Sequence, residues 1–393
     1  MRIVAKNYQD AVRGSMIGGA AGDALGYEVE FWSENEIFRS FGSSGITAYA
    51  LDSQTGQALI SDDTQMSMFT ACGLLNWEAT RQESGFKLCV AVLEAYIDWY
   101  LTQTKSYEEV SGYERFSKKG GSSWLMDVPE LFSRRAPGTT CMFALRCGRY
   151  TEWGDDFVAT NDSKGCGGIM RVAPLGLMYR PDKNYDGTIA DLDHQGALIA
   201  ALTHGHPLGY MSAAVMTHII SRIVSTEGEL VLKDIVLEAV DTVVEMYSET
   251  PSEVSYEASY GKSAVDKLRD IVNLAVKLSE NDDTDLNNIH RLGEGWIAEE
   301  ALAISVYCSL RHQDDFLAGI IAAVNHKGDS DSTGAITGNI LGAIHGYEAI
   351  KDRWSTNLEL ADVILELADD MSGAYQDKDA FNMKYRERIR KNE

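Results

Sequence analysis

Apolar residues recur along most of this chain at the three- and four-residue spacing of an amphipathic helix. The spacing is clear after residue 61, where positions 66, 69, 72 and 75 are all apolar and indicate one helix face. We expect loops over 32–60 and 281–288. The pattern predicts helices over 9–26, 61–77, 85–103, 139–147, 187–203, 207–226, 230–249, 257–280, 298–311, 313–325, 332–348, 357–372 and 379–391.

The organisation of the chain favours one helical unit. Only 6 prolines occur in 393 residues, and no internal repeat or Pro/Ser-rich linker divides the sequence. We therefore predict an all-α fold, a single compact helical bundle domain over residues 1–393, with a polar surface excursion around 104–137.

Charge and composition bear on whether the protein binds nucleic acid or a membrane. A net charge of −24 repels phosphate backbones, so we expect no direct nucleic-acid binding. No run of 18 apolar residues is present, which predicts no membrane span. The first ten residues are polar, and the six cysteines form no Cys-x-x-Cys pair. Reduced thiols and a cytoplasmic location are expected.

Two predicted helices carry glycine at every fourth position. Glycine costs about 1 kcal/mol per site in a helix relative to alanine, so such runs need a packing reason. Glycines on one face allow another backbone to come close, and we expect these two helices to pack against each other or on a shared bundle. The glycines are Gly14, Gly18, Gly22 and Gly26 in the first helix, and Gly334, Gly338, Gly342 and Gly346 in the second.

Two other stretches place a hydroxyl beside two carboxylates where a helix is predicted to begin. One is Ser61-Asp62-Asp63, and the other is Asp329-Ser330-Asp331-Ser332. Each could be a helix cap with favourable first-turn charge. Hydroxyl and carboxylate oxygens are also ligands for hard cations such as Mg²⁺, Mn²⁺ or Ca²⁺. The two stretches together therefore predict one metal site divided between two helix starts.

Three weaker signals remain. Glu28 and Glu30 follow the first helix on a segment predicted to be extended, which would place both on one side, either toward the site or in solvent. A glycine loop over 161–174 enters a helix and could present amides to phosphate. His204 and His206 have no third zinc ligand at recognisable spacing, which favours a helix end with one histidine hydrogen-bonded inside the bundle.

Several stretches together resemble one family, the ADP-ribosylglycohydrolases, which include the dinitrogenase-reductase-activating glycohydrolase. They occur in the family's order and span nearly the whole chain. The matching stretches are 18–26 with Glu30-Phe31, Ser61 to Gln65, Arg135 to Cys141, Asn161 to Pro174, Thr203-His204 with Pro207, Gly295-Trp296 with Glu299-Glu300, and Gly328 to Ser332.

The resemblance implies a binuclear metal centre that holds two divalent ions, Mg²⁺ or Mn²⁺. Its implied ligands are Ser61, Asp62, Asp63, Asp329, Asp331 and Ser332, where the family usually has threonine at the two serine positions. Glu30 is the implied catalytic carboxylate. The implied substrate-binding residues are Lys164, Gly165, Cys166, Gly167, Gly168, Ile169 and His204.

The resemblance also implies a reaction, the removal of mono-ADP-ribose from modified protein side chains by cleavage at the anomeric carbon of the ribose. Arginine is the expected linkage, although Ala136 stands where some arginine-directed members carry an acidic residue. The implied partners are ADP-ribosylated protein, ADP-ribose and an ADP-ribosyltransferase counterpart. Two other functions stay open, a non-catalytic ADP-ribose binder or toxin-immunity protein, and a two-metal phosphoesterase that acts on a nucleotide.

Overall fold

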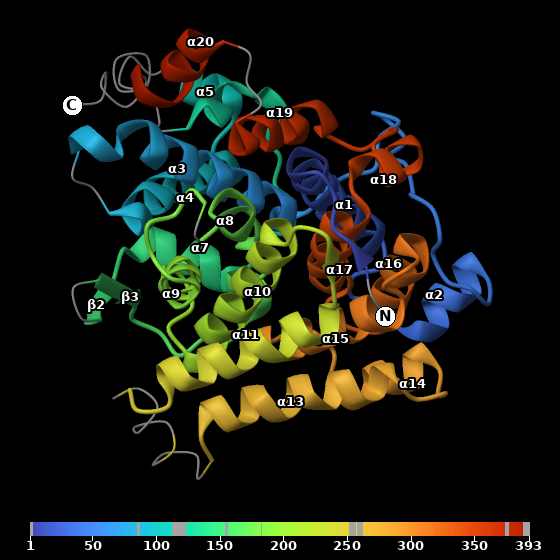
Figure 1. The fold of residues 1–393 in the computed structure, drawn as a ribbon. Helices are drawn as coiled ribbons and strands as arrows, with labels where there is room; N and C mark the ends of the chain where they lie inside the picture. The colour runs from blue at the N-terminus through green and yellow to red at the C-terminus, as the bar shows by residue number, and fades with distance from the viewer. Residues whose placement is uncertain are drawn as a thin grey trace.

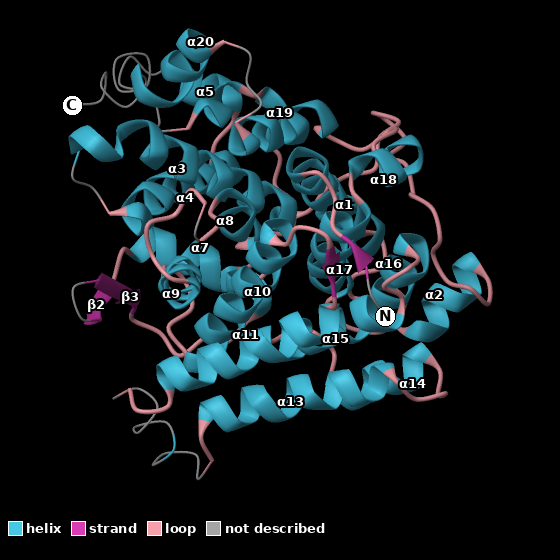
Figure 2. Ribbon diagram, in the orientation of Figure 1, coloured by secondary structure: helices cyan, strands magenta, loops and turns pink. Residues whose placement is uncertain are grey.

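The computed structural model describes residues 3–84, 87–111, 123–153, 156–181, 183–250, 257, 262–373 and 377–387. Nearly all regular structure in these residues is helical, as Figure 2 shows, so the predicted all-α class is confirmed. Two short antiparallel ladders are present. β1 (Ile3–Val4) pairs with β4 (Glu229–Leu230), and β2 (Tyr150–Trp153) pairs with β3 (Asp156–Ala159).

The predicted helices occur in the predicted order along the chain, and those over 139–147 and 298–311 have the predicted bounds. The short helices over 107–111 and 347–354 were not predicted. In the first half the helices are α1 (Tyr8–Tyr27), α2 (Glu34–Phe41), α3 (Asp62–Ser84), α4 (Leu88–Thr104), α5 (Tyr107–Ser111), α7 (Thr139–Cys147), α8 (Ala173–Met178), α9 (Ile189–Ala201) and α10 (Pro207–Ser225). In the second half they are α11 (Leu232–Tyr247), α13 (Ala264–Ser279), α14 (Asp285–Leu292), α15 (Ala298–Arg311), α16 (Phe316–Val324), α17 (Ser330–His345), α18 (Tyr347–Trp354), α19 (Ala361–Ser372) and α20 (Lys378–Asn382).

The two glycine-ridged helices, α1 and α17, lie side by side, the dark blue and orange-red helices of Figure 1. A Cβ atom added at Gly338 would lie 2.6 Å from the carbonyl carbon of Gly18, and one at Gly342 would lie 2.7 Å from that of Gly14. Ser15 Oγ donates to the Asn339 carbonyl oxygen at 2.9 Å, and Asn339 Nδ2 donates to the Ser15 carbonyl oxygen at 2.9 Å. The expected packing of these helices is confirmed.

Helix α10 lies near the centre of the bundle in Figure 1 and contacts α8, α9, α11 and α15. It is buried on all sides from Pro207 to Ser221, which fits its nearly continuous run of apolar and small residues. Among the described residues, no helix is long and apolar enough to cross a membrane. None of the six cysteines, all of which lie in the described residues, forms a disulfide.

Three local predictions are wrong. The segment after α1 is a turn and not an extended strand, because the Glu30 amide donates to the Gly26 carbonyl oxygen and Glu28 has helical backbone angles. Glu28 is exposed and Glu30 is half-buried, so the two glutamates do not share a side. The stretch predicted as loop over 32–60 contains α2, because Ser33 and Glu36 form a capping box. The loop predicted over 281–288 already contains the start of α14.

The predicted surface excursion is described in part. Residues 112–122 of the 104–137 stretch lie outside the described residues. On either side of them, α5 and two 3-10 turns, η1 (Trp124–Asp127) and η2 (Pro129–Leu131), are present. Leu125 and Leu131 are buried, so this flank of the stretch packs on the core.

Candidate functional site

The first part of the site is the N-terminus of α17. Asp329 is its N-cap, and its Oδ1 accepts a hydrogen bond from the Ser332 amide at 3.4 Å. The Asp329 amide in turn donates to the Glu294 carbonyl oxygen at 2.8 Å. This loop is close-packed because Gly328 has a φ of 125°, which lets its backbone pass directly against Glu294. Asp329, Asp331 and Ser332 are therefore held in a buried and well-defined position.

The second part is the N-terminus of α3, where Asp62 and Asp63 occupy the first turn. The Asp62 amide donates to the Arg135 carbonyl oxygen at 3.0 Å, and Asp62 Oδ2 accepts from the Gly138 amide at 3.1 Å. Arg135 also forms an ion pair with Glu359 at 2.7 Å. The loop before α7 is thereby attached to the start of α3.

Asp23 is a site residue that the sequence analysis missed. Its carboxylate accepts from the Ser61 amide at 3.0 Å and from the Thr64 amide at 3.1 Å, and the Thr64 hydroxyl donates to it as well. It therefore caps α3 from a neighbouring helix, α1. The sequence did contain a signal for this role, an aspartate among the glycines and alanines of α1. A carboxylate on a buried helix face needs a hydrogen-bonding partner.

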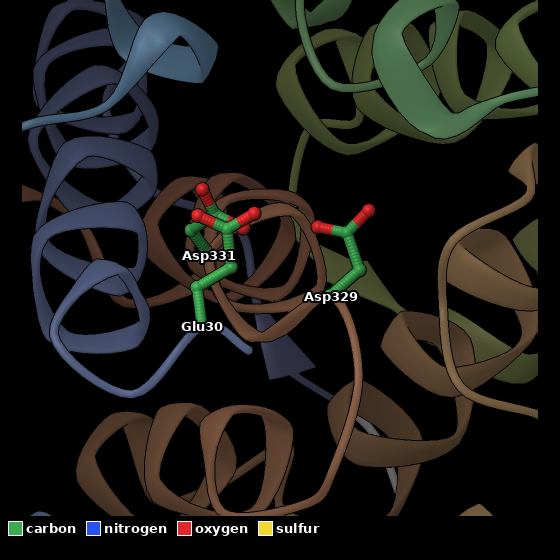
Figure 3. Close-up of side chains that lie close together, drawn as sticks. All are labelled: Glu30, Asp329 and Asp331. Atoms are coloured by element: carbon green, nitrogen blue, oxygen red, sulfur yellow. The ribbon is translucent and has the colours of Figure 1, made fainter. Parts of the chain in front are cut away.

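Glu30, Asp329 and Asp331 form one cluster, in which one oxygen from each carboxylate lies within 4.8 Å of the others. Figure 3 shows the three carboxylates gathered above the start of α17, with Glu30 arriving from the turn after α1. The close approach of the two helices makes this possible, since a Cβ atom at Gly26 would lie only 2.6 Å from the Asp331 amide nitrogen.

A cavity of about 400 Å³ joins this cluster to the start of α3 and to the glycine loop. Of the residues predicted from sequence, those that line it are Glu30, Asp62, Asp63, Asp329, Asp331, Ser332, Gly165, Cys166, Gly167 and His204. The predicted residues that do not line it are Ser61, Lys164, Gly168 and Ile169. Ser61 instead accepts from the Asp63 amide at 3.2 Å, and Lys164 forms an ion pair with Glu299.

Burial, followed by crowded negative charge, raises the pKa values of the carboxylates around the cavity. Burial, reinforced by Asp331 and Asp329, raises the pKa of Glu30 to about 10. Burial and Asp331 likewise raise the pKa of Asp23 to about 7. Burial raises the pKa of Asp62, Asp63 and Asp329 well above the usual range for aspartate. Such a cluster is stable in its charged form only beside positive charge.

Buried carboxylate oxygens without a hydrogen-bond donor are positions where a cation can bind. Within the described part of the chain, Glu30 Oε2 and Asp63 Oδ2 are buried and accept no hydrogen bond. Burying such an acceptor costs roughly 1–3 kcal/mol, and more when it is charged. Carboxylate oxygens are the ligands that Mg²⁺ and Mn²⁺ prefer. The cluster can therefore hold a divalent cation.

The glycine loop lies beside the cluster, because Cys166 Sγ donates to Asp329 Oδ2 at 2.7 Å, and it rests on His204. Cβ atoms at Gly165 and Gly167 would lie 3.3 Å and 3.0 Å from the His204 ring. His204 Nδ1 hydrogen-bonds Thr203 Oγ1 at 2.8 Å, and burial together with the Arg171 charge lowers the pKa of His204 to about 3. His204 is thus a neutral buried histidine inside the bundle, as its sequence context indicated. Two loop amides, those of Cys166 and Ile169, already donate to protein carbonyl oxygens.

A buried, carboxylate-lined cavity at two helix starts is an arrangement that can hold divalent cations. Comparison with known proteins identifies the family. Residues 5–380 match the model of the protein family described as ADP-ribosylglycohydrolase. The chain therefore belongs to the ADP-ribosylglycohydrolase family and is a hydrolase, which confirms the resemblance seen in its motifs.

Individual relatives are distant. The chain is 25% identical to ADP-ribosylhydrolase ARH1 of Dictyostelium discoideum, over 93% of this chain and 94% of that protein. It is 23% identical to ADP-ribosyl-[dinitrogen reductase] glycohydrolase of Rhodospirillum rubrum, over 89% and 91%. It is 25% identical to bovine ADP-ribosylhydrolase ARH3, where the match spans only about half of each protein, 50% and 54%.

A solved chain titled ADP-ribosylglycohydrolase-related protein complex has the same fold. The two chains superpose with a TM-score of 0.57 over 93% of this chain and 98% of that one, at 22% sequence identity.

Proposed function

We propose that this protein removes mono-ADP-ribose from modified protein side chains, with arginine as the preferred linkage, and that it uses two Mg²⁺ or Mn²⁺ ions. The observation that carries this proposal is the cluster of Glu30, Asp329 and Asp331 at one end of a cavity of about 400 Å³. The names of the relatives support the substrate class, because they describe ADP-ribosylhydrolases of comparable length.

In the proposed reaction a water oxygen forms a bond to the anomeric carbon of the ribose. The bond from that carbon to the arginine nitrogen breaks, its electron pair leaves with the nitrogen, and the nitrogen gains a proton. The ions would be held by Asp62, Asp63, Asp329, Asp331 and Ser332, and when bound they would orient the ribose hydroxyls and polarise the attacking water. Glu30 faces the same space and would transfer a proton or stabilise positive charge on the sugar.

The glycine loop beside the cluster would hold the diphosphate. Gly165 and Gly167 allow backbone to approach a ligand closely, and amides at such loops attract phosphate oxygens. His204 would support this loop from beneath and is neutral, so it adds no charge to the binding of the anion.

Glu30→Gln tests the catalytic carboxylate. We expect kcat to fall by about 10²-fold or more, because a positioned proton-transfer group is lost, while affinity for ADP-ribose stays near that of the unmodified protein. Glu28→Gln is the matched control, since Glu28 is exposed two residues away on the same turn. Release of ADP-ribose from a modified protein is measured for both variants. A collapse of affinity with unchanged kcat would make Glu30 a binding residue.

The leaving group is tested with arginine-linked and serine-linked mono-ADP-ribosyl peptides at equal concentration with Mg²⁺. We expect faster release from arginine. A chain with a net charge of −24 attracts a cationic target, although this attraction is screened beyond about 8 Å at physiological salt. Faster release from serine would overturn the arginine preference. Binding of ADP-ribose without any release would instead identify a non-catalytic binder.

A further inference from the structure

Two aromatic side chains are exposed at the mouth of the cavity and stack on each other. Phe31 has 70% of its surface exposed and Trp296 has 36%. Their ring centroids are 5.3 Å apart and the rings are inclined by only 21°. Large aromatic residues are normally buried, so a stacked pair in solvent at the entrance to a binding cavity calls for a functional explanation.

The backbone holds both rings in place. Phe31 has a φ of 68°, a region that residues with a Cβ atom rarely occupy and that is concentrated at functional sites. Trp296 follows Gly295, whose φ is 87°, and its carbonyl oxygen accepts from the Cys166 amide at 3.2 Å. The tryptophan is thus attached to the glycine loop, and the phenylalanine to the turn that carries Glu30.

The aromatic pair lies close to the residues that are proposed to act on the scissile bond. Phe31 directly follows Glu30, and both residues line the same cavity as Asp329 and Asp331. One face of the Phe31 ring is covered by Trp296, and its high exposure leaves the other face open. Phe31 is thus an exposed ring in the lining of the cavity that holds the cluster.

The chemistry of this entrance suits a planar cation. The face of an aromatic ring attracts a guanidinium group, which also stacks on it. Among the described residues that line the cavity, none is lysine or arginine, whereas Glu30, Asp62, Asp63, Asp329 and Asp331 are acidic. A cation on the cavity side of the pair would therefore meet an aromatic surface and, among the described lining residues, no lysine or arginine.

We propose that Phe31, supported from behind by Trp296, is the platform on which the guanidinium of an ADP-ribosylated arginine lies. This inference rests on the proposed function and names the residues that recognise its leaving group. Trp296 is a positioning residue, because it acts by fixing the orientation of the Phe31 ring.

The test compares two ligands that differ only in the arginine, ADP-ribosylarginine and ADP-ribose. Their dissociation constants are measured by calorimetry with Mg²⁺, in a Glu30→Gln background that slows turnover. Phe31→Leu removes the ring but keeps a Cβ atom at the same backbone angle, so its strain matches that of the parent. Phe31→Tyr keeps the ring and is the conservative control.

For Phe31→Leu, we expect affinity for ADP-ribosylarginine to fall by about 3- to 30-fold and affinity for ADP-ribose to change less than about twofold. Phe31→Tyr should retain the parent's preference for the arginine ligand. If affinity for both ligands fell equally, the ring would stack on the nucleotide. If affinity for neither ligand fell, Phe31 would have no part in recognition. Either result overturns the platform. The binding difference does not depend on turnover, so a protein that fails to release ADP-ribose would contradict the proposed function alone.

Discussion

Asp329→Asn is expected to abolish binding of Mn²⁺ and to lower kcat/KM for ADP-ribosyl-arginine release by about 10²- to 10³-fold or more. Asparagine keeps the oxygen that caps α17 toward the Ser332 amide, so the helix start should be retained. What is lost is one negative charge that a cation bound at this buried cluster would contact. Metal binding is measured by calorimetry, and activity with and without EDTA.

Asp241→Asn is the matched control for this variant, because Asp241 is exposed on α11 and does not line the cavity. Removing charge from a crowded cluster relieves repulsion, so the metal-free Asp329→Asn protein should unfold at the same temperature as the parent or higher. Full activity of the Asp329→Asn protein at saturating Mn²⁺ would contradict the role of Asp329 as a ligand.

Gly338→Ala is expected to lower the free energy of unfolding by about 3 kcal/mol or more, or to prevent folding. Helix propensity alone predicts the opposite, a gain of about 1 kcal/mol. Packing decides the sign, because the new Cβ atom would lie 2.6 Å from the carbonyl carbon of Gly18, and a backbone atom cannot rotate away. Urea denaturation followed by circular dichroism measures the change.

Gly56→Ala provides the contrast. Gly56 has a φ of 70° and nothing within 4 Å of an added Cβ atom. The free energy of unfolding of this variant should therefore fall by only about 1–2 kcal/mol, from backbone strain. If Gly338→Ala were no more destabilising than Gly56→Ala, the contact between α1 and α17 would not be the close backbone packing described here.

The order of the helices was predictable because apolar spacing reports which face of each helix is buried. Glycine spacing likewise predicted that α1 and α17 pack together, since only a close neighbour justifies glycines in a helix. The two carboxylate-rich helix starts were visible as sequence motifs, and the structure places Asp62, Asp63, Asp329, Asp331 and Ser332 around one cavity. Their roles as ligands stay predictions.

What sequence reasoning missed depends on contacts between distant segments. Asp23 could not be assigned because its partners, the amides of Ser61 and Thr64, belong to another helix. Glu28 and Glu30 do not alternate as in a strand, because the chain turns after α1 and brings Glu30 to the start of α17. Capping residues were the overlooked local signals, namely Ser33 with Glu36 for α2 and Thr284 for α14.

The pairing of α1 with α17 also determines when a newly made chain can become active. Ser15 and Asn339, which hydrogen-bond across the two helices, are 324 residues apart in sequence. At roughly 5–20 residues per second, α1 leaves the ribosome about 15–65 s before its partner exists. During this interval its glycine and alanine face is uncovered and open to chaperones. A chain whose synthesis stops before Asp329 carries Glu30 without the carboxylates that it faces in Figure 3.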